Sequence, residues 1–299
     1  MARSDDSGAR ATVGPAIAAA RSLGRRSWRQ VIKVVVYGLL LVNFLVYLSN
    51  DWTAASHTAR EGWTFLQWAG AFATTLDEAA WFVLLFLFEL ETYLLDDQAF
   101  TRRRVAIMHG VRFVCILFIG HTVYAFGDNL VTLAAADPVS AASLCEFAGR
   151  DLAYTVNLSY TPVDALNCER LSTASSYYLF EEGTLVTDPA GMRMEWELAV
   201  VDLVEVVAWI TILFFIELTV RLQDRGITGG TLMRAALGIK LGLYGVLWLC
   251  AAYWLYRGHW IFAWDEVLWI LGFTAIDMNI EEWRQEIDEE QARPPAPKR

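Results

Sequence analysis

The chain alternates long apolar stretches with short polar segments. Six stretches consist almost entirely of apolar residues, and they occupy positions 31–48, 63–95, 105–124, 198–218, 235–256 and 260–280. A helix needs about 20 apolar residues to cross a hydrocarbon core of about 30 Å. The pattern therefore predicts an all-α integral membrane protein with about six transmembrane helices. No stretch contains proline, the usual cause of sharp kinks, so we expect uninterrupted helices. The second is overlong, and its beginning could lie along the membrane interface.

The polar segments divide the chain into five parts. These are a cytoplasmic N-terminal tail at 1–29, transmembrane helices 1–3 at 30–129, an extracytoplasmic insertion at 130–195, transmembrane helices 4–6 at 196–281, and an acidic, proline-rich cytoplasmic tail at 282–299. Arg25 and Arg26 before the first apolar run resemble the start of an export signal. We favour an uncleaved first helix, because Lys33 has counterparts in two later helices.

The placement of positive charge predicts the orientation. Lys and Arg gather before the first stretch, in the loop at 102–104, and between Arg221 and Arg234. Cytoplasmic loops carry an excess of these residues, so both termini are expected in the cytoplasm of a bacterial inner (plasma) membrane. The net charge is −10 and no basic face is visible, which excludes a nucleic-acid partner.

The four cysteines fall into two pairs. Cys145 and Cys168 lie in the polar insertion, where we predict a disulfide because the orientation places that segment in an oxidising compartment. Cys115 and Cys250 lie within apolar stretches and are interpreted as small buried hydrophobic residues.

A repeated spacing of acid, tryptophan and acid occurs in the second, fourth and sixth stretches. The three copies are Asp77-x3-Trp81-x7-Glu89, Glu205-x3-Trp209-x7-Glu217 and Asp265-x3-Trp269-x7-Asp277. All three stretches are expected to run toward the cytoplasm. The sequence therefore predicts three pseudo-repeated helical hairpins around an axis along the membrane normal. Internal repeats in membrane proteins often place the functional site on such an axis.

The repeat predicts two layers of carboxylates, separated by about 18 Å at 1.5 Å per residue. The inner layer contains Glu89, Glu217 and Asp277. Lys33, Arg112 and Lys240 lie at similar depth on the other helices, so we interpret this layer as structural ion pairs that join the hairpins. Buried pairs of this kind fix register more than they add stability.

The outer layer contains Asp77, Glu205 and Asp265, with Glu78 and Glu266 beside them. No Lys or Arg lies at matching depth, and His121 is the nearby histidine. Carboxylates brought together cannot all stay ionised without a counter-ion. The sharper hypothesis is a proton or metal-ion site formed by Asp77, Glu205, Asp265 and His121. The alternative is that these acids lie separately near the outer surface, in contact with water.

Two functions follow from this pattern. The first is conduction or transport of a cation, either a proton or a metal ion, through a bundle lined by carboxylates. The second is a non-transporting scaffold, sensor or assembly subunit, with a protein partner at 130–195 or at the C-terminal tail. The lipid bilayer is a partner in both cases, and both are compatible with an oligomer. No nucleophile elbow, phosphate loop or HExxH motif indicates an enzyme, and no particular cofactor is indicated.

Overall fold

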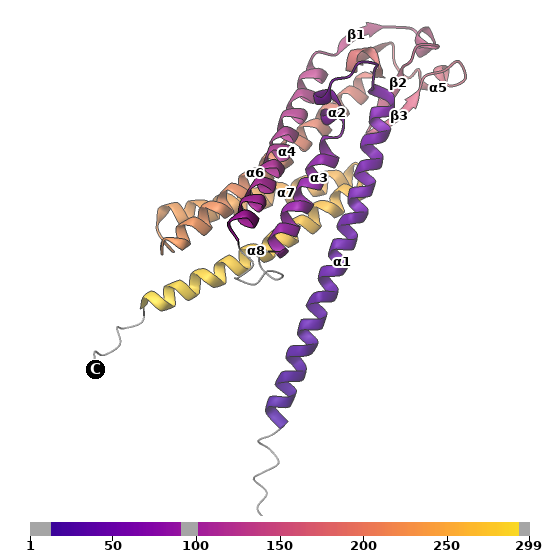
Figure 1. Ribbon diagram of the computed structural model, residues 1–299. Helices are drawn as coiled ribbons and strands as arrows, with labels where there is room; N and C mark the ends of the chain where they lie inside the picture. Colours follow the sequence, from indigo (N-terminus) through magenta and orange to yellow (C-terminus); the bar gives the residue numbers. More distant parts are fainter. Residues whose placement is uncertain (1–12, 91–100, 293–299) are drawn as a thin grey trace, which may run out of the picture. The chain divides into compact units, whose positions relative to one another are not determined.

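A computed structural model describes residues 13–90 and 101–292 of the chain, and these residues are mostly helical (Figure 1). The helices are α1 (Val13–Thr58), α2 (Phe65–Ala71), α3 (Ala73–Glu89), α4 (Arg102–Ala134), α5 (Cys168–Leu171), α6 (Pro189–Asp224), α7 (Thr231–Tyr256) and α8 (Trp260–Ala292). The strands are β1 (Asp137–Ser140), β2 (Ala153–Val156), β3 (Ser159–Pro162), β4 (Ser176–Phe180) and β5 (Leu185–Thr187). The chain divides into two compact units, Met1–Leu45 and Val46–Arg299. The described part of the first is the beginning of α1, and the other helices and all strands belong to the second.

Four helices are long and apolar enough to cross a membrane. They are Val34–Thr58 within α1, and the whole of α4, α6 and α7. The consecutive helices α2 and α3 meet the same test only when they are taken together. Helix α8 does not meet it, because Asp265, Glu266 and Asp277 interrupt its apolar part. The structure therefore supports a helical protein with four or five candidate spans, and the sixth span stays a prediction.

The second apolar stretch is broken, so the prediction of uninterrupted helices is wrong there. The axes of α2 and α3 differ by 78°. Phe72, between them, has a non-helical backbone, and no proline is involved. The Asp51 carboxylate on α1 accepts hydrogen bonds from the Thr75 backbone N–H (2.9 Å) and hydroxyl (2.7 Å). Asp51 thus accepts a hydrogen bond from a backbone N–H in the first turn of α3, which would otherwise lack an acceptor because no helical turn precedes it.

The segment between α4 and α6, residues 135–188, folds into a small mixed sheet that we call the β segment. It is shorter than the predicted insertion at 130–195, because α4 continues to Ala134 and α6 already begins at Pro189. The strand order is β1-β4-β5-β2-β3, in which only the β2–β5 pair is parallel. A disulfide joins Cys145 to Cys168, which confirms that prediction.

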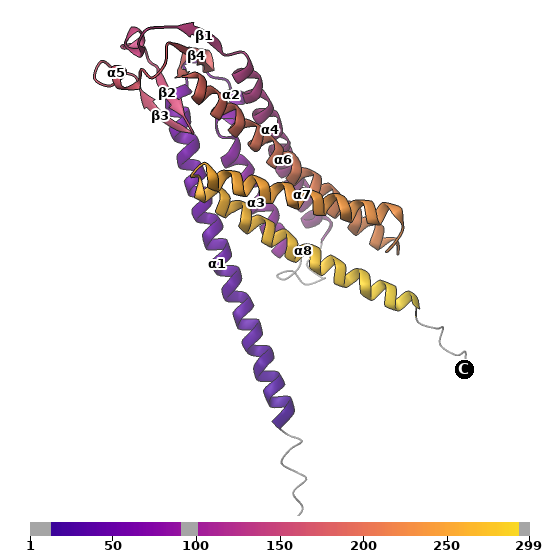
Figure 2. The same cartoon turned by 180° about the vertical axis from the view of Figure 1, so that it is seen from behind.

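Helices α6, α7 and α8 pack side by side, as both views show (Figures 1 and 2). In the core, the Trp81 ring lies 6.3 Å from the Trp209 ring and 5.8 Å from the Trp269 ring. Phe273 contacts all three rings. The three tryptophans of the sequence repeat therefore come together, whereas the threefold pseudosymmetry stays a prediction.

Candidate functional site

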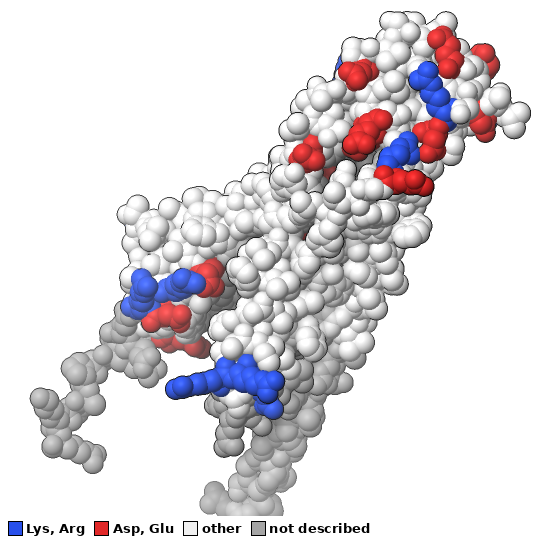
Figure 3. All heavy atoms as spheres, turned by 45° about the horizontal axis from the view of Figure 1, so that its top comes forward, with Lys and Arg blue, Asp and Glu red and all other residues white. Residues whose placement is uncertain are grey.

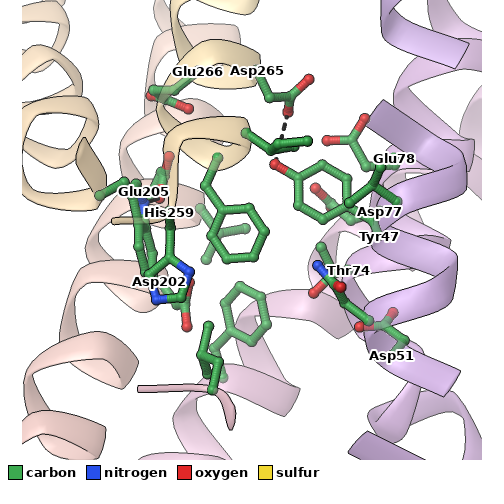
Figure 4. Close-up of a pocket in the computed structure, with 18 of the residues that line it drawn as sticks. Tyr47, Asp51, Thr74, Asp77, Glu78, Asp202, Glu205, His259, Asp265 and Glu266 are labelled. Atoms are coloured by element: carbon green, nitrogen blue, oxygen red, sulfur yellow. Dashed lines mark hydrogen bonds between the residues drawn. The ribbon is translucent and has the colours of Figure 1, made fainter. Parts of the chain in front are cut away.

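A cavity of about 480 Å³ lies between the end of α1 and helices α3, α6 and α8. The turn between β2 and β3 and the loop before α8 also border it. Its lining contains seven carboxylates, which are Asp51, Asp77, Glu78, Asp202, Glu205, Asp265 and Glu266 (Figure 4). None of the described residues that line it is a Lys or an Arg. The cavity is thus a strongly acidic compartment without a fixed positive charge in its walls.

The three outer acids of the repeat all line this cavity, and each accepts a hydrogen bond from an aromatic side chain. Asp77 accepts from the indole of Trp81 at 3.0 Å, one helical turn along α3. Glu205 on α6 accepts from the indole of Trp254 at 2.9 Å. Asp265 on α8 accepts from the Tyr47 hydroxyl at 3.2 Å. The three acids therefore border one common space.

Two pairs of carboxyl groups lie within hydrogen-bonding reach of each other. Glu78 on α3 meets Asp265 on α8, and Glu205 on α6 meets Glu266 on α8. Trp209 also donates to Glu266 at 3.2 Å. Two carboxyl oxygens in contact need a shared proton or a cation between them, because two negative charges at that separation repel. Helix α8 therefore supplies one member of each pair from adjacent positions.

Three carboxylate oxygens in this cavity lack a hydrogen-bond donor. Asp77 Oδ1, Glu78 Oε2 and Glu266 Oε1 are buried and accept no hydrogen bond from any described residue. Glu78 and Glu266 are the most buried of the three residues, with only 7% and 4% exposed. An unpaired buried carboxylate oxygen is costly, and in native proteins it calls for a specific explanation such as a bound ligand. All three oxygens belong to residues in the wall of the same cavity.

Several further polar residues of the lining are not indicated by the sequence pattern, among them Tyr47, Asp51, Asp202 and His259. Asp202 precedes Glu205 by three positions and so lies on the same face of α6. That spacing could have identified it. Tyr47, Asp51 and His259 lie outside the repeat, so no periodic signal marks them.

His121 does not line this cavity, so the structure does not bring it together with the three acids. It lies on α4, where its ring packs 6.0 Å from the Tyr124 ring. Neither ring nitrogen has a hydrogen-bond partner among the described residues. The histidine in the cavity wall is His259, in the loop between α7 and α8, and burial lowers the pKa of its imidazole.

The β2–β3 turn borders the cavity and is held against that loop. Asn157 and Leu158 both have positive φ values, 51° and 59°, as a two-residue hairpin turn requires. The Asn157 amide donates to the Arg257 carbonyl at 3.1 Å, and its oxygen lies 3.0 Å from His259 Nε2. The β segment thus contributes directly to the wall of the cavity.

Two ion pairs involve described residues of the inner layer. Lys240 pairs with Asp277, which also accepts from the Tyr244 hydroxyl at 2.9 Å. Glu217 is exposed and pairs at 2.6 Å with Arg221 on the same helix, so this pair does not join two hairpins. Arg112 is half-buried on α4. The side chains of Lys33 and Glu89 lie outside the described residues.

No group of three His, Cys, Asp or Glu residues within 13–90 and 101–292 has the arrangement of a metal site. The carboxylates instead form pairs and single groups around a common space. Comparison of the chain with protein-family models, with curated proteins and with solved structures gives no match. The function has to be inferred from the geometry of this cavity.

Proposed function

We propose that the chain is a multi-pass membrane protein that binds a cation in the acidic cavity and transports it across the bilayer. The observation that carries this proposal is the enclosure of seven carboxylates in one cavity whose described lining has no Lys or Arg. Even on the mildest scale, an ionised carboxylate at mid-membrane depth costs about 2.5–3.5 kcal/mol. A group of them is stable only if protons or other cations neutralise it.

The broken helix supports transport rather than a purely structural role. The break at Phe72 lies five and six residues before Asp77 and Glu78. Many transporters form their sites at interrupted helices, because the unwound backbone can contact the substrate and move with it. The helix break and the acidic pairs therefore occur in the same part of the fold.

The surface charge is consistent with the predicted orientation. On the face seen in Figure 3, a broad band with few charged side chains lies between two ends that each carry acidic and basic side chains. The exposed Arg102, Arg103 and Arg104 begin α4, at the end far from the β segment. By the positive-inside rule the β segment lies outside a bacterial inner membrane, and both termini lie in the cytoplasm.

Reconstitution tests the proposal directly. Purified protein is reconstituted in proteoliposomes, and potassium efflux sets an inside-negative membrane potential that drives cations inward. Proton entry is followed with a trapped pH dye, with and without external cations. Glu205→Gln and Asp265→Asn should each reduce flux at least tenfold while the purified protein stays monodisperse. Glu217→Gln is the matched control, because this exposed acid lies on the same helix as Glu205 but outside the cavity. Unchanged flux in both cavity variants would overturn the proposal.

A non-transporting subunit is the second candidate, and the β segment favours it. This segment has its own buried core, formed by residues that include Leu144, Phe147, Tyr177 and Val186, and a disulfide. Such a rigid folded segment could present a binding surface to a protein partner. In that case the reconstituted protein should show no flux of any cation. Cross-linking from an engineered cysteine at the exposed Leu166 should instead capture the same partner in every preparation.

A further inference from the structure

The lining of the acidic cavity is aromatic as well as acidic. Tyr47, Trp81, Trp209, Trp254, Phe262 and Trp269 all contribute to it. Their rings form two groups in contact, Phe262 with Tyr47 and Trp254, and Trp81 with Trp209 and Trp269, at centroid distances from 5.2 Å to 6.3 Å. An aromatic face attracts a desolvated ammonium group but gains little from a strongly hydrated metal ion.

The cavity is also larger than a bare ion requires. Its volume of about 480 Å³ lies within the usual range for sites that bind small organic molecules, about 300–1,000 Å³. The described carboxylates do not converge three at a time on one point, as a metal ion would require. The volume of the cavity and the arrangement of its carboxylates therefore fit an organic cation with an apolar part.

The carboxylates lie on two walls. Figure 4 shows Asp77, Glu78 and Asp265 on the side of Tyr47, and Asp202, Glu205 and Glu266 on the opposite side. Each wall contains one pair of carboxyl groups in contact, Glu78 with Asp265 and Glu205 with Glu266. Each pair also contains one buried oxygen that accepts no hydrogen bond from a described residue, Glu78 Oε2 in one and Glu266 Oε1 in the other. An ammonium group has three N–H donors and can satisfy both members of such a pair.

We propose that the cavity binds a straight-chain diamine or polyamine, with one ammonium group at each carboxyl pair and the alkyl chain against the tryptophans between them. This inference rests on the proposed function and identifies the class of its substrate. It accounts for features that a proton path alone leaves unexplained: the volume, the aromatic lining and the division of the acids between two walls.

The charge balance predicts proton exchange. In the absence of ligand, each pair shares one proton and carries a single negative charge. When an ammonium group binds, the shared proton leaves, and the two carboxylates face the ammonium as hydrogen-bond acceptors. The other titratable groups in the lining are Tyr47, Asp51, Asp77, Tyr160, Asp202 and His259. Binding of one diamine should thus release up to two protons.

Calorimetry on the purified full-length protein in detergent tests the inference. Putrescine, cadaverine and spermidine are compared with butylamine, pentylamine, Na⁺ and Mg²⁺, in two buffers of different ionisation enthalpy. We expect the diamines to bind at least tenfold more tightly than the monoamines of equal length, and to release protons. Glu78→Gln and Glu266→Gln should each abolish the preference for diamines, and Glu217→Gln should leave it unchanged.

The outcomes separate this inference from the proposed function. Equal affinity for diamines and monoamines, or no binding of either by the wild-type protein, would overturn the inference even if a variant fails to fold. Cation flux that persists without diamine binding would leave the proposed function intact. Diamine binding by a protein that shows no flux of diamine or proton would support the site and refute transport.

Discussion

The Asn157 side-chain oxygen lies 3.0 Å from His259 Nε2, and this contact joins the β2–β3 turn to the loop before α8. The Asn157 amide nitrogen donates to the Arg257 carbonyl, which fixes the orientation of the amide. His259 must then carry its proton on Nε2 in order to donate to the Asn157 oxygen. The neutral imidazole already makes this contact. Protonation would add a positive charge at Nδ1 inside a partly buried wall.

We predict that the contribution of His259 to the thermal stability decreases as the pH falls below about 6.5, the ordinary pKa of histidine. Burial lowers the pKa of His259 in the folded protein, so the unfolded chain binds more protons in this range. The contribution of His259 is therefore complete above the unfolded pKa and is lost as the pH falls toward the folded one. Melting temperatures in detergent between pH 5 and 8 would measure this.

His259→Gln provides the comparison for that measurement, because an amide donor keeps the hydrogen bond to Asn157 without titrating. Relative to the wild-type protein, the variant should become more stable as the pH falls from 6.5 to 5. Melting temperatures that change in parallel in both proteins would assign the pH dependence to other groups.

The acidic site could be predicted in part because helical spacing is a local property. Asp77, Glu205 and Asp265 recur four residues before a tryptophan, and this spacing places the acid and the tryptophan on one face of a helix. The hydrogen bonds across the site follow a different pattern. Trp81 donates to Asp77 on its own helix, but Trp209 donates to Glu266 on α8. Which groups meet between helices depends on packing, which the spacing does not determine.

The predictions that differ from the structure depend on tertiary contacts. His121 was selected because it lies at a suitable depth, but depth does not fix the direction in which a side chain points. The break between α2 and α3 has no proline to mark it. It is stabilised by Asp51, 24 residues away from Thr75 in the chain. The Cys145–Cys168 disulfide was predictable because both residues lie in the one long polar segment.

Replacement of both Cys145 and Cys168 by serine should destabilise the β segment by roughly 3 kcal/mol, because the disulfide closes a loop of 23 residues. Limited proteolysis of the purified protein would detect this as faster cleavage within 135–188. The buried Cys115 and Cys250 serve as the control, since their replacement by alanine should not change that rate. Equal cleavage of all variants would contradict the prediction.

Asp188 is expected to stabilise the start of α6 at neutral pH. Its carboxylate accepts hydrogen bonds from the Gly191 N–H (2.7 Å), the Thr173 hydroxyl (2.9 Å) and the Tyr154 hydroxyl (3.2 Å). Partial burial acts to raise the pKa of Asp188, but these hydrogen bonds outweigh it and lower the pKa below its usual value. Asp188→Ala should therefore lower the free energy of unfolding by about 1–2 kcal/mol at pH 7, as the loss of a helix cap does.

The destabilisation caused by Asp188→Ala should become smaller at acidic pH. A carboxylate whose folded pKa is lowered adds stability above its unfolded pKa of about 3.9, and loses it as the pH falls through the folded value. Melting temperatures of the wild-type protein and Asp188→Ala should converge between pH 4 and 2.5. A difference that is constant over this range would show that the carboxylate charge has no part in the cap.

Lys240 and Asp277 join α7 to α8 through an ion pair in which the lysine side chain is only 5% exposed. Removal of one partner leaves the other charge buried, which typically costs about 3–5 kcal/mol. We therefore expect Lys240→Met to lower the melting temperature strongly, and Asp277→Leu to do the same. The double variant should recover much of the loss, because two apolar side chains of similar volume leave no charge to neutralise. A double-mutant cycle on melting in detergent measures the recovery. If the two single effects simply add, the two side chains contribute independently and the pair does not act as a unit.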